Sequence, residues 1–105
     1  MSTTLTTYHD LALDPEGFLQ KPEDWSEDIA REIARENGIA DLTERQWQVV
    51  TFMRTRFLET GNAPTIRTLG KESGVPIKEL YQLFPKGPAK LAAKIGGIPK
   101  PHGCI

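Results

Sequence analysis

Cysteine is nearly absent from this sequence of 105 residues, which holds one, Cys104, beside two histidines. One thiol cannot form a disulfide within the chain, and one cysteine with two histidines falls short of the four ligands of an ordinary structural zinc site. We therefore expect Cys104 to act as a free thiol or to bond to another molecule. We expect neither a metal nor an organic cofactor.

A long apolar run is also missing. No segment approaches the roughly eighteen apolar residues that a membrane-spanning helix needs, and residues 1–10 lack the basic flank and apolar core of a signal peptide. The composition, 38% hydrophobic and 26% charged, is typical of a globular protein with one modest core. The sequence predicts one small domain, a cytoplasmic location and no membrane contact.

Acidic residues are missing from the last quarter of the chain. From Leu80 onward there is no Asp or Glu, and the basic residues there are Lys86, Lys90, Lys94 and Lys100. The part before Leu80 has nine basic and fourteen acidic side chains, a net charge of −5. A basic tail on an acidic body suits an acidic or phosphate-rich partner, and it equally suits a tail that lies against its own body. Charge alone leaves both interpretations open.

Apolar spacing and capping residues predict five helices. Thr43 and Gln46 form a capping box, which opens the strongest helix, at about residues 44–60, and Gly61 ends it. Because this segment is apolar on more than one face, we expect it to be the central core helix. The other helices are expected from Trp25 or Ser26 to Asn37, from a cap at Thr65 to Glu72 or Ser73, over 77–84 and over 88–95.

The two ends of the chain are predicted to differ from this helical part. Asp14-Pro15-Glu16-Gly17 suits a type I turn, so a small β-hairpin is expected at about residues 8–20. Glycines and prolines after residue 95 exclude a helix or a central strand there. The predicted fold is mostly α (α+β), a small orthogonal helical bundle in a domain of residues 1–95. A mobile C-terminal arm, residues 96–105, carries the thiol.

Residues 69–83 have the spacing of a helix-turn-helix, with Gly70 and Gly74 four positions apart before the second helix. Binding of DNA by that second helix would need cations to neutralise phosphates. Its Lys78 is offset by Glu79, so we interpret the motif as a scaffold. A helix-turn-helix regulator of DNA remains as an alternative function from another class.

Cys104 is the candidate reactive residue. A free cysteine is often a small buried apolar side chain, but a terminus rich in Gly and Pro has little core to enter. The reactive form is the thiolate, which the nearby His102 and Lys100 would favour as cations. A thiolate can attack a sulfur donor, leave as a persulfide, and then pass the sulfur to an acceptor. This exchange needs accessibility more than an enclosed catalytic pocket.

The C-terminal motifs resemble the DsrC/TusE family. FPKGPAK at 84–90 and GGIPKPHGCI at 96–105 are similar to the family's C-terminal signature. Three further stretches match, at residues 16–19, 22–25 and 63–67. The resemblance covers about residues 13–105. It implies a mostly helical fold with an N-terminal hairpin, a helix-turn-helix-like core and a mobile arm, and a sulfur carrier whose next-to-last cysteine, here Cys104, holds a persulfide.

The number of arm cysteines divides the family. In the DsrC branch a second cysteine lies eleven positions before the last one, and Ala93 stands there in this chain. Disulfide or trisulfide chemistry within the arm is therefore excluded. The one-cysteine pattern resembles the TusE branch, which implies a donor complex of TusBCD type and an acceptor like a tRNA thiouridylase. A DsrC-like carrier in sulfur oxidation or sulfite-reductase metabolism is the alternative.

The resemblance also implies supporting residues. Arg67, Lys86 and Lys90 match family positions, where they would steady an anionic persulfide or a docked partner, although ordinary surface charge explains them equally well. His102 and Lys100 are added because they neighbour the thiol in the arm. We expect a sulfurtransferase that acts as a stoichiometric persulfide carrier in synthesis of wobble 2-thiouridine, with at most indirect contact to tRNA.

Overall fold

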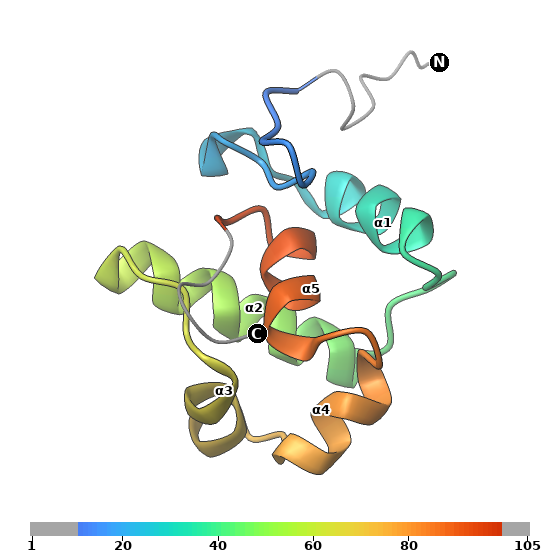
Figure 1. The fold of residues 1–105 in the computed structure, drawn as a ribbon, viewed down its shortest axis with the longest axis vertical. Helices are drawn as coiled ribbons and strands as arrows, with labels where there is room; N and C mark the ends of the chain where they lie inside the picture. Colours follow the sequence, from blue (N-terminus) through green and yellow to red (C-terminus); the bar gives the residue numbers. More distant parts are fainter. Residues whose placement is uncertain (1–10, 100–105) are drawn as a thin grey trace.

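The structure, a computed structural model, describes residues 11–99 of the chain. It is mostly helical, as predicted, and its helices in chain order are η2 (Pro22–Asp24), α1 (Glu27–Glu36), α2 (Glu44–Thr60), α3 (Ile66–Glu72), α4 (Ile77–Leu83) and α5 (Pro88–Ile95). In Figure 1, α5 lies across α2 in the middle of the molecule, with α1 to one end and α3 and α4 to the other.

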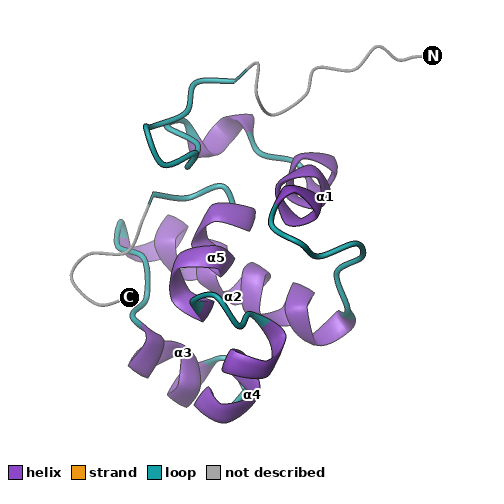
Figure 2. Cartoon of the chain, turned by 45° about the vertical axis from the view of Figure 1, so that its right-hand side comes forward, coloured by secondary structure: helices purple, strands orange, loops and turns teal. Residues whose placement is uncertain are grey.

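The helix around which the others pack is α5. It contacts α1, α2, α3 and α4, and Figure 2 shows it among them. Its Ala89, Ala92 and Ala93 are fully buried, and such small side chains let neighbouring backbones come close. The prediction that α2 is the central helix is wrong in this respect. That helix forms one wall of the core, to which it contributes Val49 and Met53.

The predicted capping box begins α2. The Gln46 backbone N–H donates to Thr43 Oγ1 (3.1 Å), and the Thr43 backbone N–H donates to Gln46 Oε1 (2.9 Å). The Gln46 side-chain amide also donates to the Leu83 carbonyl at the end of α4 (2.9 Å), so this cap joins two helices. Within residues 11–99, no helix has both the length and the apolar character to cross a membrane.

The predicted helix-turn-helix-like unit consists of α3 and α4. Gly70 lies so close to α4 that a Cβ there would be 2.3 Å from Ile77 Cγ1, and only glycine fits. The turn is held by the buried Ser73, whose hydroxyl donates to the Leu69 carbonyl (2.5 Å) and accepts from the Val75 N–H (3.1 Å). Helix spacing in this unit therefore depends on one glycine and one serine.

The predicted hairpin at about residues 8–20 is present as a turn closed by one bridge. The Gly17 N–H donates to the Asp14 carbonyl (2.9 Å), and Leu13 forms an isolated antiparallel bridge with Leu19. The first three residues of the predicted hairpin lie outside the described part of the chain. Because an isolated two-stranded ribbon is marginal in water, packing has to hold this turn. Leu19 is accordingly only 1% exposed.

Candidate functional site: the arm root and the lysine pocket

Three of the predicted site residues, Cys104, His102 and Lys100, lie outside the described residues. Their roles therefore stay predictions. Two parts of the described chain bear on them. One is the segment from which the predicted arm extends, and the other is a pocket that contains two of the predicted supporting lysines.

The arm root, Gly96–Ile98, is packed into the body. The Gly97 N–H donates to the Lys94 carbonyl (3.2 Å) and the Ile98 N–H donates to the Ala93 carbonyl (3.1 Å). With Gly97 at a φ of +69°, these bonds form a Schellman motif that closes α5. All three residues of the arm root are buried. The division into a body and a mobile arm at residue 96 stays a prediction. The first three residues of the predicted arm are hydrogen-bonded to the end of α5.

Trp25 holds the arm root from the N-terminal side. Its indole Nε1–H donates to the carbonyl of Ile95, the last residue of α5, at 2.8 Å. A Cβ added to Gly97 would lie 2.3 Å from Trp25 Cδ1, which no real side chain tolerates. The glycine at this position is therefore required twice, by its positive φ and by the indole packed against it.

Arg54 completes this arrangement, which we call the arm-root clamp (Trp25 and Arg54). From α2, its guanidinium donates to the Gly96 carbonyl (3.0 Å) and to the Pro22 carbonyl (2.9 Å). Its Cζ lies 4.4 Å from the centroid of the Trp25 ring, which is a cation–π contact. Burial lowers the pKa of Arg54, but an arginine remains charged at neutral pH. One cation thus joins a segment before α1 to the segment after α5.

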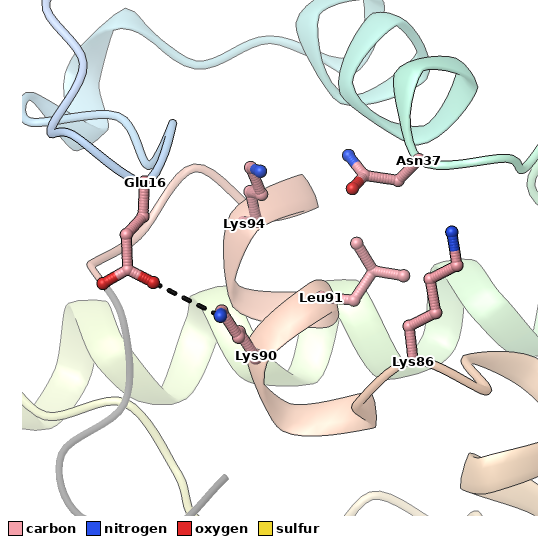
Figure 3. Close-up of a pocket in the computed structure, with 6 residues that line it drawn as sticks. All are labelled: Glu16, Asn37, Lys86, Lys90, Leu91 and Lys94. Carbon is pink, nitrogen blue, oxygen red and sulfur yellow. Dashed lines mark ion pairs between the residues drawn. The ribbon is translucent and has the colours of Figure 1, made fainter.

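The lysine pocket is a hollow of about 210 Å³ beside α5. It is lined by Glu16, Asn37, Lys86, Lys90, Leu91 and Lys94, and Figure 3 shows these side chains around it. Lys90 Nζ lies 3.2 Å from Glu16 Oε1, and Lys94 Nζ lies 5.8 Å from the centroid of the Phe18 ring. Three cations and one carboxylate therefore meet at this pocket.

The pocket brings together some of the predicted supporting residues and leaves one apart. Lys86 and Lys90 both line it, whereas Arg67 lies exposed on α3 and is not among the lining residues. Lys94 is predicted as part of the basic tail and as one of the cations that would favour the Cys104 thiolate, but not as a member of such a pocket. The four-residue spacing of the three lysines is the signal that would have grouped them. In the part of the chain from 11 to 99, no group of three or more His, Cys, Asp or Glu is placed to hold a metal ion.

Trp25 and Arg54 are the residues that sequence reasoning missed at the arm root. The sequence places Trp25 near the start of a helix, in a stretch that matches the family, and Arg54 inside a long helix, but it connects neither residue with the arm root. Their partners lie far along the chain, 70 positions away for the indole and 32 and 42 positions away for the guanidinium. No local pattern marks such contacts.

The fold and the sequence together define a class of protein: a small helical body, followed by a glycine-rich segment that contains a cysteine. The family model described as "DsrC like protein" matches residues 6–105. The chain therefore belongs to the DsrC-like family.

Curated relatives come from both branches. Sulfurtransferase TusE of Escherichia coli is 45% identical over 104 residues, covering 91% of this chain and 94% of the relative. Sulfurtransferase TusE of Yersinia pseudotuberculosis is 46% identical over 100 residues, covering 88% and 91%. The gamma subunit of dissimilatory-type sulfite reductase from Nitratidesulfovibrio vulgaris is 37% identical over 93 residues and 89% of each chain.

Solved structures have the same fold. DsrC of Allochromatium vinosum superposes with a TM-score of 0.77 at 39% identity, covering 90% of each chain. A chain in the structure of dissimilatory sulfite reductase I superposes with a TM-score of 0.81 at 35% identity, covering 90% of this chain and 91% of that one. The small helical fold with a helix-turn-helix-like unit is thus that of the DsrC-like family.

Proposed function

We propose that this protein is a sulfurtransferase that carries sulfur as a persulfide on Cys104. The observation that carries the proposal is the position of its only thiol, next to last in a chain 45% identical to a sulfurtransferase TusE over 91% of its length. The Cys104 thiolate attacks the terminal sulfur of a donor persulfide, R–S–SH. The donor's S–S bond breaks, the donor leaves as a thiolate, and Cys104–S–SH forms with no net oxidation.

The second half of the cycle returns the thiol. An acceptor thiolate attacks the terminal sulfur of Cys104–S–SH, the S–S bond to Cys104 breaks, the acceptor becomes a persulfide, and Cys104 is regenerated as a thiolate. Ala93 is fully buried in α5 and carries no thiol. One molecule therefore cannot release its sulfur by closing a disulfide within its own chain, and each exchange involves a second molecule.

The proposed pathway is synthesis of wobble 2-thiouridine in tRNA, in the cytoplasm. The donor is then a complex of TusBCD type and the acceptor is a tRNA thiouridylase-like enzyme, with tRNA contacted at most indirectly. The TusE names of the relatives from Escherichia coli and Yersinia pseudotuberculosis support this branch, as does the single cysteine.

A second candidate is a DsrC-like carrier in sulfur oxidation or sulfite-reductase metabolism. The relative in Nitratidesulfovibrio vulgaris and the similarity to a chain of dissimilatory sulfite reductase I favour it. Deleting the gene in the source organism separates the two candidates. The tRNA pathway predicts loss of 2-thiouridine from digested tRNA and its return with the native gene but not with Cys104→Ser. Unchanged 2-thiouridine after deletion would favour the second candidate.

DNA regulation, the alternative from another class, receives no support from α4. The carboxylate of Glu79 on this helix accepts two hydrogen bonds from Arg45 of α2, at 2.7 and 2.9 Å. The Arg45 cation beside α4 is therefore already neutralised by Glu79 and offers little to a phosphate backbone. We interpret the helix-turn-helix-like unit as a scaffold.

Intact-mass spectrometry tests the carrier step. The protein is incubated with inorganic polysulfide or with a persulfidated donor protein, the excess is removed, and the mass is measured with and without reductant. We expect a gain of one sulfur atom that reductant reverses and that Cys104→Ser abolishes. His9→Ala, which leaves the thiol in place, serves as the control. A native protein that gains no sulfur from any persulfide donor would overturn the proposal.

A further inference from the structure

We propose that the lysine pocket docks an acidic segment of the protein that exchanges sulfur with Cys104. This inference rests on the proposed function, because it assigns the partner's contact surface. The occupant is a short stretch of Asp and Glu side chains on a partner protein. The pocket's charge, its construction and its place beside the arm root carry the inference.

The charge of the pocket is unusual for this molecule. Three of the four lysines from residue 80 onward line it, while the part of the chain before Leu80 has a net charge of −5. Glu16 neutralises part of this charge through Lys90. Among the described residues neither Lys86 nor Lys94 forms an ion pair. Two cations are thus available to an incoming carboxylate.

The pocket is held by packing as well as by charge. Lys94 lies against the N-terminal turn, where a Cβ on Gly17 would be 3.0 Å from its Cε and 3.1 Å from its Nζ. The Lys94 ammonium also lies over the Phe18 ring. Asn37, the C-cap of α1, lines the opposite side, and its side-chain amide donates to the Ile33 carbonyl (2.8 Å). Three separate segments therefore form its wall, as Figure 3 shows.

These features favour an acidic protein segment over RNA. A nucleic-acid backbone carries a negative charge at every nucleotide, and phosphates beyond the pocket would be repelled by the acidic body of this protein. The lining also has no aromatic side chain on which a base would stack. A volume of about 210 Å³ admits a few carboxylate side chains. A short acidic segment meets the cations and avoids the surrounding acids.

The position of the pocket fits a role in sulfur exchange. Lys90 and Lys94 are on α5, and the arm root follows directly from the end of this helix. The clamp fixes the arm root through Arg54 and Trp25. A partner docked at the pocket is therefore held next to the point from which the thiol-bearing segment extends.

The experiment uses the full chain labelled with ¹⁵N and two probes of similar charge, a hexaglutamate peptide and a hexauridylate RNA. At low salt we expect hexaglutamate to shift the amides of Gly17, Asn37 and residues 86–87 and 89–94, and to bind more tightly than the RNA. Raising the salt should weaken binding, since screening shortens the reach of these charges. Absence of shifts at these amides, or tighter binding of the RNA, would overturn the proposal.

Charge reversal identifies the pocket as the site. Lys86→Glu with Lys94→Glu should raise the hexaglutamate Kd about tenfold, because two attractions become repulsions while the Lys90–Glu16 pair is kept. Lys71→Glu with Lys78→Glu, exposed on α3 and α4, makes the same change of net charge and should alter the Kd less than about twofold. Lys86→Glu alone, at an exposed position before α5, should raise it about threefold without a risk to folding. Equal effects of the two double variants would overturn the proposal.

Loading with inorganic polysulfide separates this inference from the proposed function. Loading needs Cys104 but no partner, so it is measured on the native protein and does not depend on whether the pocket binds hexaglutamate. If loading succeeds and the pocket variants bind hexaglutamate normally, the pocket assignment fails alone. If the native protein does not load, the carrier function fails.

Discussion

At the scale of single residues, Gly97 should be among the least replaceable positions. It combines a φ of +69° with an approach that would put a Cβ 2.3 Å from Trp25 Cδ1. Gly97→Ala should lower the free energy of unfolding by about 2–4 kcal/mol, because strain of the backbone adds to overpacking. Urea denaturation followed by circular dichroism measures this loss.

Gly38→Ala is the matched control for that change. Gly38 also has a positive φ, +91°, but no atom lies within 4 Å of a Cβ built on it. Only the backbone term remains, so the loss should be about 1 kcal/mol. Equal losses for the two variants would show that the Trp25 contact gives way easily.

Arg54 should tolerate even a conservative change poorly. Its guanidinium donates to the carbonyls of two segments and stacks on Trp25, and a lysine ammonium cannot reproduce that planar geometry. We expect Arg54→Lys to lower the free energy of unfolding by about 1–3 kcal/mol in urea. Arg35→Lys, on the exposed side of α1, should change it by less than about 0.5 kcal/mol. Similar values for both would argue against the clamp.

Glu79 should contribute a pH-dependent part of the stability. Its hydrogen bonds from Arg45 lower the pKa of its carboxyl below the ordinary value of 4.5. A lowered folded-state pKa stabilises the fold above the unfolded value, and this contribution is lost as the pH falls through the folded pKa. The stability difference between native protein and Glu79→Gln should therefore shrink as the pH falls below about 4.5.

The difference is expected to be small, since the pair is solvent-accessible. Urea denaturation at several pH values between neutrality and about pH 3 measures it. Glu23→Gln removes an exposed carboxyl and serves as the comparison. A difference between native protein and Glu79→Gln that grows in acid would contradict the assignment.

Whether a residue of the candidate site could be predicted from the sequence depends on how far along the chain its partners lie. Cys104 stands out in the sequence because it is the only thiol and ends a Gly/Pro-rich segment, and its role remains a prediction. Lys86 and Lys90 were singled out by resemblance, and they prove to share one pocket with Lys94. Arg54 could not be predicted, since its two acceptors come from segments on either side of it and far along the chain.

At the scale of helices and turns, local chemistry predicted the boundaries well. The Thr43 cap and the terminal Gly61 of α2 agree with the structure, as do the start of α1 beside Ser26 and the Thr65 cap of α3. Each of these signals acts between residues only three or four positions apart. Of the predicted hairpin, the described residues contain the turn, which forms locally, and one antiparallel bridge, whose pairing depends on distant packing.

The central place of α5 was not predictable by the same means. Apolar length drew attention to α2, but a helix in the middle of a bundle needs small side chains that allow close approach on several sides. Ala89, Ala92 and Ala93 provide them. A count of large apolar residues ranks such a helix low, although it contacts all the other α-helices.

This packing predicts that α5 does not accommodate larger residues. Ala92 is fully buried, so Ala92→Leu should lower the free energy of unfolding by about 1–3 kcal/mol or more through overpacking. Ala40→Leu, at an exposed position between α1 and α2, adds the same atoms without a clash and should change it by less than about 0.5 kcal/mol. Thermal and urea denaturation compare the two. A stable Ala92→Leu variant would mean that the core has room beside α5.

At the scale of the whole molecule, the charge asymmetry acquires a location. The sequence left two interpretations of the basic tail, contact with a partner and contact with its own body. The Lys90–Glu16 ion pair in the described structure is a contact of the basic tail with its own body. Lys86 and Lys94 line the same pocket, which is the arrangement expected if the basic tail contacts a partner.

The buried arm root limits where the thiol can travel. Four residues separate Pro99 from Cys104, and covalent geometry restricts the five Cα–Cα steps between them to a span of about 18 Å whatever path they follow. Ile98, the residue before Pro99, is fully buried, so the starting point of this span is fixed on the body of the protein. A sulfur confined to such a volume has a local concentration on the order of tens of millimolar for any partner held within reach. For the carrier that we propose, delivery of sulfur then depends on how long the partner stays bound as well as on how often the two molecules meet.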